Sequence, residues 1–95
     1  MSKLYYTPPT DEQFNDVKNN AMELWKEVAH DESYANEKIG AINDIQNVQD
    51  NFMYMVAMFD DGNQKRLANK LSPETCVAIR ERLIDGGSPE YLINF

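Results

Sequence analysis

Apolar residues recur at helical spacing in the first third of the chain. They step by three and four residues, which places them along one side of an α-helix. Thr10-Asp11-Glu12-Gln13 precedes this stripe and fits a capping box, in which the threonine hydroxyl and the glutamine side chain each bond a backbone N–H. We therefore predict a helix from Thr10 to about residue 29, with its apolar side formed by Phe14, Val17, Ala21, Leu24, Trp25 and Val28.

The same spacing returns after a polar connection at residues 30–33 and continues to Phe59. It predicts a second, longer helix over residues 34–60. A connection this short joins antiparallel neighbours, so residues 10–60 are expected to form a helical hairpin. Gln49 interrupts one version of the second stripe, and a polar residue in such a position can fix helix register or oligomeric state. That version comprises Ile42, Ile45, Gln49, Phe52, Val56 and Phe59.

Residues 52–59 are apolar on every side of the predicted helix. A one-sided hairpin cannot bury such a segment, so it must be covered from two directions, either by the C-terminal helices or by a second subunit. A chain of 95 residues has a modest core, and association is a natural way to bury more apolar surface. We expect a homo-oligomer, with a homodimer as its smallest form.

Turn and helix-start signals divide the last third of the chain. Gly62 is available for a left-handed helix end and Asn63 for a new start, so a short helix is predicted over residues 64–71. Ser72-Pro73-Glu74 provides an N-cap, a proline at the first helical position and an acid behind it. It predicts a helix over residues 73–85, ended by the glycines that follow.

Proline residues mark both ends of the chain. Residues 1–9 are predicted to be an extended arm because of Pro8-Pro9, and Ser88-Pro89-Glu90 opens a last turn followed by an apolar tail. Length allows one domain. The expected fold is all-α: one helical domain over residues 10–95, with an antiparallel two-helix hairpin at 10–60 and two or three short C-terminal helices at 63–95.

Charge is unevenly distributed, although the formal net charge is −7. Residues 1–62 hold twelve acids and four lysines, whereas residues 63–95 hold five basic residues against four acids. This polarity permits an anion site in the C-terminal part, and we expect no direct DNA binding. The alternative reading is an acidic solvated surface that keeps the protein in solution.

The composition also bears on location. The N-terminus lacks the apolar run of a signal peptide, and no apolar stretch exceeds eight residues, far short of a membrane span. A single cysteine excludes an intrachain disulfide. These features predict a cytoplasmic protein that does not enter the membrane.

Catalytic chemistry has few candidates in this sequence. The one histidine, His30, lies in a polar connection and the one cysteine, Cys76, near a helix start, and nothing brings them together. No glycine-rich phosphate loop or metal-ligand spacing is present. Cys76 is either a thiolate favoured by the helix N-terminus or a small buried apolar residue. We predict a protein that is not an enzyme and that holds no metal or cofactor.

A site that binds an anion requires fewer groups than a catalytic site, namely a few cations and an aromatic face on which a base stacks. Tyr5 and Tyr6 on the arm, Lys18 on the first helix, and Lys65 and Arg66 in the basic part supply these groups. In the alternative reading the tyrosines anchor the arm to the core, and the cations balance neighbouring acids.

Residues 5–59 combine a tyrosine arm, a threonine-started helix and a polar turn with three further segments: Val17-Lys18, Ala21-Met22-Glu23-Leu24 and Gln49-Asp50-Asn51-Phe52-Met53-Tyr54-Met55-Val56-Ala57. In this combination they resemble a family of small phage proteins, the helical-hairpin sponges that sequester cyclic oligonucleotide signals of the bacterial CBASS and Thoeris-type defences. The resemblance implies a homo-oligomeric anti-defence protein acting in the host cytoplasm.

The same resemblance implies roles for individual residues. Tyr5 or Tyr6 would stack on a base and Lys18 would meet a phosphate. The family also places an arginine late in its second helix, but residues 53–59 contain no basic side chain. Arg66 or Lys65 would have to replace it.

Two other functions remain open. The chain could be an inhibitor or adaptor whose acidic helices dock on a basic host protein, in some cases by nucleic-acid mimicry, with the carboxylates of the first two helices as the contact residues. It could instead be a structural or assembly component that docks through its apolar tail at residues 91–95.

Overall fold

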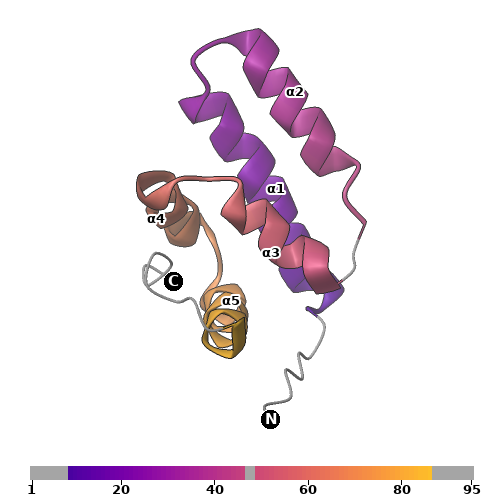
Figure 1. Ribbon diagram of the computed structural model, residues 1–95, viewed down its shortest axis with the longest axis vertical. Helices are drawn as coiled ribbons and strands as arrows, with labels where there is room; N and C mark the ends of the chain where they lie inside the picture. Colours follow the sequence, from indigo (N-terminus) through magenta and orange to yellow (C-terminus); the bar gives the residue numbers. More distant parts are fainter. Residues whose placement is uncertain (1–8, 47–48, 87–95) are drawn as a thin grey trace.

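A computed structural model of the chain describes residues 9–46 and 49–86, and these residues form helices joined by short connections (Figure 1). The predicted all-α class is thus confirmed, with no strand in the described ranges. None of the helices in these ranges is both long enough and apolar enough to cross a membrane. The helices are α1 (Asp11–Val28), α2 (Glu32–Asn43), α3 (Gln49–Ala57), α4 (Asp61–Lys70) and α5 (Pro73–Gly86).

The start and the buried side of α1 agree with the sequence prediction. The Gln13 backbone N–H donates to Thr10 Oγ1 at 3.0 Å, and the Thr10 N–H donates to Gln13 Oε1 at 3.1 Å, which completes the capping box. Five of the predicted apolar positions are buried and Val28 is half-buried. The buried ones are Phe14, Val17, Ala21, Leu24 and Trp25.

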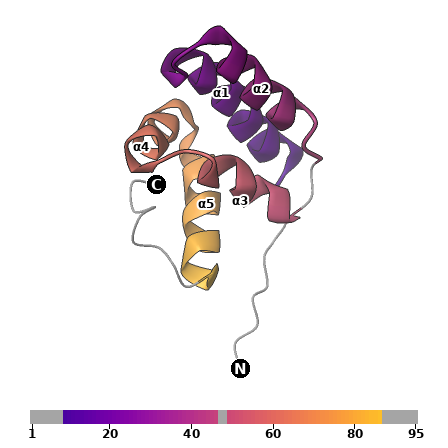
Figure 2. The same cartoon turned by 45° about the horizontal axis from the view of Figure 1, so that its top comes forward.

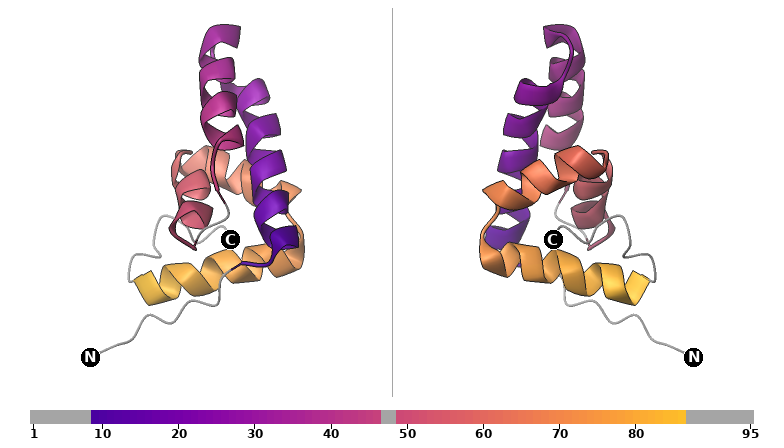
Figure 3. Two further views of the ribbon diagram at one scale, coloured as in Figure 1. Left: turned by 90° about the vertical axis from the view of Figure 1, so that its right-hand side faces the viewer. Right: turned by 90° about the vertical axis from the view of Figure 1, so that its left-hand side faces the viewer.

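The predicted helix over residues 34–60 is wrong, because this stretch forms two helices, α2 and α3. α2 begins two residues earlier, where the Asp31 side chain accepts from the Tyr34 N–H at 2.7 Å. An unbroken helix of that length would extend about 40 Å, whereas the 18 residues of α1 extend about 27 Å. The apolar second half would then project beyond α1. Instead the chain turns back after α2, and α3 packs against α1 (Figures 1 and 3).

α1 is the central element of the core. It packs against each of the other four helices. α2 lies alongside α1, while α3, α4 and α5 gather below this pair (Figure 2). α5 runs crosswise to α1 at the end where α1 begins (Figure 3). The Trp25 ring of α1 stacks on Phe59 with a centroid distance of 4.8 Å and meets Tyr34 of α2 edge-on at 5.7 Å.

The apolar block at residues 52–59 is covered within the single chain. Phe52, Met55 and Val56 have no exposed surface, Phe59 keeps 4 %, and only Tyr54 among the large side chains is mainly exposed. The sequence left two possibilities open for covering this block, the chain's own C-terminal helices or a second subunit. The chain's own helices cover it. A second subunit is therefore not required to bury this block, and oligomerisation stays a prediction.

The start of α4 differs from the prediction, whereas the start of α5 agrees. Asp60 is the N-cap of α4, since its Oδ1 accepts from the Asn63 N–H at 3.0 Å. Gly62 consequently lies inside α4 rather than ending the preceding helix. Ser72 caps α5 as predicted, its Oγ accepting from the Thr75 N–H at 3.2 Å. The arm at 1–8 and the tail at 87–95 lie outside the described residues.

Candidate functional site

The residues proposed for anion binding occupy separate parts of the structure. Tyr5 and Tyr6 lie outside the described residues. Lys18 is half-buried, and its Nζ donates to the backbone carbonyl of Ile45 at 3.0 Å, in the connection after α2. Lys65 and Arg66 are exposed on α4. No hydrogen bond or ring contact within the described ranges joins Lys18 to either of them, so Lys18 supports the α2–α3 connection.

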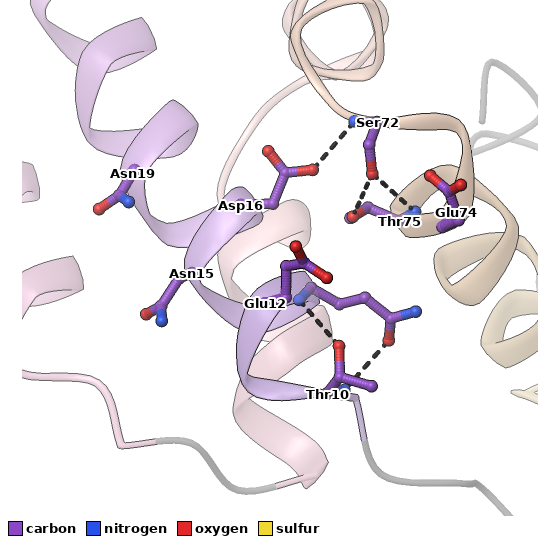
Figure 4. Close-up of a pocket in the computed structure, with 9 residues that line it drawn as sticks. Thr10, Glu12, Asn15, Asp16, Asn19, Ser72, Glu74 and Thr75 are labelled. Atoms are coloured by element: carbon purple, nitrogen blue, oxygen red, sulfur yellow. Dashed lines mark hydrogen bonds between the residues drawn. The ribbon is translucent and has the colours of Figure 1, made fainter.

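A different feature unites distant parts of the chain: an open polar groove of about 730 Å³ between the start of α1 and the start of α5 (Figure 4). Carboxylates, carboxamides and hydroxyls line it. None of the lining residues is a lysine, arginine or histidine. The lining residues are Thr10, Glu12, Gln13, Asn15, Asp16, Asn19, Ser72, Glu74 and Thr75.

Helical spacing produces the α1 wall of the groove. Glu12, Asp16 and Asn19 follow one another at steps of four and three, so they share one side of α1. The buried stripe occupies another side of the helix and turns these polar residues away from the core. The α1 wall therefore follows from the amphipathic pattern that also forms the core.

Asp16 holds the two walls together. Its Oδ2 accepts from the Ser72 backbone N–H at 2.9 Å, and its Oδ1 accepts from Asn20 Nδ2 at 2.9 Å. Ser72 in turn shares a 2.9 Å hydrogen bond with the hydroxyl of Thr75, which is 1 % exposed. This chain of hydrogen bonds fixes the N-terminus of α5 against α1 (Figure 4).

Two further carboxylates remain available to a ligand. Glu12 and Glu74 are exposed, and within residues 9–46 and 49–86 neither has a hydrogen-bond or ion-pair partner. A second polar hollow, of about 460 Å³ at the α1–α2 turn, differs because Lys26 is among its lining residues beside Asp31 and Glu32. The lining of the α1–α5 groove contains carboxylates and no basic side chain. This groove is thus suited to a cation.

No histidine or cysteine is among the residues that line the groove. Cys76 lies close to it but is half-buried, with its Sγ donating to the Ala68 carbonyl at 3.5 Å. Burial raises the pKa of the Cys76 thiol, the Arg80 guanidinium lowers it, and the Asp16 carboxylate raises it. The net shift is upward and favours the neutral thiol, in line with the buried apolar role rather than the thiolate. No cluster of potential metal ligands occurs in the described ranges.

The sequence indicated the carboxylates of the first two helices as possible contact residues for a basic partner but did not bring Glu12, Asp16 and Glu74 into one site. The spacing of Glu12, Asp16 and Asn19 was a readable signal for one wall. The opposite wall depends on the contact of Asp16 with Ser72, 56 residues away, which no local pattern encodes.

Comparison with known proteins gives no match to a family model, to a curated protein or to a solved structure.

Proposed function

We propose that this chain is a non-enzymatic binding protein that docks a basic segment of another protein in the groove between α1 and α5. The proposal corresponds to the acidic inhibitor or adaptor considered from the sequence, with a host protein as partner. The observation that supports it is the lining itself: three carboxylates, two of them without a partner in the described ranges, and no basic side chain.

The groove offers the atoms that a lysine or arginine side chain requires. Guanidinium and ammonium groups carry only donors, and the carboxylates, amide oxygens and hydroxyls of this groove are acceptors. Hydrogen bonds between charged partners are stronger than neutral ones, and an arginine can bond a carboxylate with two N–H groups. The net charge of −7 adds attraction for a basic partner at long range, and salt would weaken it.

The helix arrangement, the location and the oligomeric state that accompany this function are also proposals. α1 and α2 would form an antiparallel hairpin, joined by the turn at residues 29–31. The protein would work in the cytoplasm, alone or as a homo-oligomer.

The test measures binding of a short arginine-rich peptide by isothermal titration. Replacing Glu12 and Glu74 together by Gln should weaken binding about 5- to 30-fold, because each solvent-exposed charge pair contributes roughly 0.5 to 1 kcal/mol. Asp16 is left unchanged because it anchors α5. The matched control replaces Glu23 and Glu37, exposed acids outside the groove, and changes the net charge by the same amount. Equal losses in the two double variants would contradict a role for the groove.

The same titration distinguishes the sponge hypothesis. Cyclic di- and trinucleotides are tested on the unaltered chain and on Tyr6→Ala, Lys18→Ala and Arg66→Ala. Binding that these substitutions weaken, with no binding of the basic peptide, would replace the groove proposal by a cyclic oligonucleotide ligand.

A further inference from the structure

The helix α4 presents two cations to solvent. Lys65 and Arg66 follow one another on this helix, and both are exposed. In the described part of the chain neither forms a hydrogen bond, an ion pair or a ring contact. Lys70, on the same helix, differs because its Nζ donates to Glu27 Oε2 at 3.0 Å. Lys65 and Arg66 are therefore available to another molecule.

A glycine leaves the helix surface beside these cations without a side chain. Gly62 precedes Lys65 and Arg66 by three and four residues, so it is their neighbour on the surface of α4. A Cβ added at Gly62 would meet Asp60 Oδ1 at 3.8 Å, an ordinary van der Waals contact, so the described fold does not require a glycine there. Bare helix backbone beside two cations permits the close approach of a second molecule.

The groove between α1 and α5 carries the complementary charge. Its two carboxylates without a partner in the described ranges stand on opposite walls, Glu12 on α1 and Glu74 on α5 (Figure 4). Consecutive side chains diverge by about 100° around a helix, so Lys65 and Arg66 can each reach a different wall. Among the described residues, no ion pair joins these cations to the groove of their own chain. The groove of a second copy offers them the same carboxylates.

We propose that the α4 face formed by Gly62, Lys65 and Arg66 docks in the α1–α5 groove of a second copy of this chain. This inference rests on the proposed function, because the second copy acts as a basic partner of the groove. The α4 face and the groove are different surfaces, so two copies either exchange both contacts or leave ends to which further copies add. A basic segment of a host protein competes for the same groove, and self-association covers the groove until such a segment displaces α4.

The first test separates the two halves of the contact by sedimentation equilibrium at low salt. One variant combines Lys65→Gln with Arg66→Gln and keeps the groove, and the other combines Glu12→Gln with Glu74→Gln and keeps the α4 face. Each should weaken a contact about 5- to 30-fold, because one exposed charge pair corresponds to roughly two- to fivefold in an equilibrium constant. An equimolar mixture should recover association and stop at pairs, since each pair uses the one intact face and the one intact groove. Added salt should weaken the association by screening these charges.

Matched variants control for charge and for added bulk. Lys26→Gln removes an exposed lysine of α1 and should weaken association less than Lys65→Gln alone. Gly62→Gln places a neutral side chain in the contact and should weaken it about two- to fivefold or more, at least as much as the loss of one charge pair. Gly40→Gln, at an exposed position of α2 where an added Cβ meets nothing within 4 Å, should leave association unchanged. Circular dichroism checks that every variant is folded.

The outcomes distinguish this inference from the proposed function. An unaltered chain that stays monomeric at every concentration, double variants that associate as strongly as it does, or a mixture that does not recover association would overturn the self-docking. If the arginine-rich peptide binds a chain that stays monomeric, the self-docking fails and the proposed function stands. If the copies associate through α4 and the groove while the peptide does not bind, the host partner fails instead. Where both occur, the peptide should dissociate the copies.

Discussion

At the scale of single residues, Asp16 connects parts of the molecule that the sequence keeps apart. Its carboxylate anchors the first residue before α5, holds Asn20 of its own helix and raises the pKa of Cys76. It was readable from the sequence only as one of several acids on the polar side of the first helix. Its role depends on which distant backbone N–H it meets, and only the folded chain provides that information.

The state of Cys76 yields a prediction about pH. Its folded pKa is raised, so the folded chain retains the thiol proton at a pH where the unfolded chain has lost it. The stability contributed by this group is present below the pKa of the unfolded thiol and is lost as the pH rises through the folded pKa. At about pH 9, alkylation of Cys76 by iodoacetamide should be slower in the folded chain than in urea. Mass spectrometry follows the reaction, and equal or faster reaction in the folded chain would indicate a thiolate favoured by the α5 N-terminus.

At the scale of elements, helix starts were predictable where the signal was unambiguous. Thr10 and Ser72 were found from the sequence, whereas Asp31 and Asp60 were not. Asp31 lies between His30 and Glu32, and Asp60 precedes a second aspartate, so several neighbouring residues could have been the cap. The break between α2 and α3 was missed for another reason. The apolar repeat runs through it, so periodicity does not mark the break. A straight helix over residues 34–60 would be longer than α1, and α1 could not cover its second half.

The cap at Asp60 can be tested by a pair of substitutions. Asp60→Ala removes the acceptor of the Asn63 N–H and should lower the free energy of unfolding by about 0.5 to 2 kcal/mol. Asp60→Asn keeps an oxygen acceptor and should stay within a few tenths of a kcal/mol of the unaltered chain. Urea unfolding followed by circular dichroism measures both. Equal losses would show that the charge, rather than the cap, stabilises α4.

At the scale of the whole molecule, α1 is the element on which every other helix packs, and the apolar block of α3 fills the space beside it. The buried side of α1 followed from periodicity, and the all-α class followed from periodicity together with the helix-start signals. The groove could not be predicted, because α5 supplies one of its walls and lies more than 40 residues from α1 along the chain. Its position is a consequence of tertiary packing.

Phe52 tests this packing. Phe52→Ala empties a site with no exposed surface and should cost about 3 to 5 kcal/mol, much of the total stability of a typical small domain. Tyr54→Ala, an exposed neighbour on α3, should change stability by less than about 0.5 kcal/mol. Thermal unfolding measures the difference. A Phe52→Ala chain with unchanged stability but an altered association state would show that the block serves an interface instead.

The stacking of Trp25 on Phe59 also gives the protein an optical property. Trp25 is the single tryptophan among 95 residues, and its ring joins α1 to the segment that follows α3. Indole fluorescence shifts to longer wavelength when the ring meets water, so the emission of this chain reports on the one site where the Trp25 ring contacts both Phe59 and Tyr34. Emission wavelength therefore reports whether Trp25 stays buried between α1, α2 and the segment that follows α3.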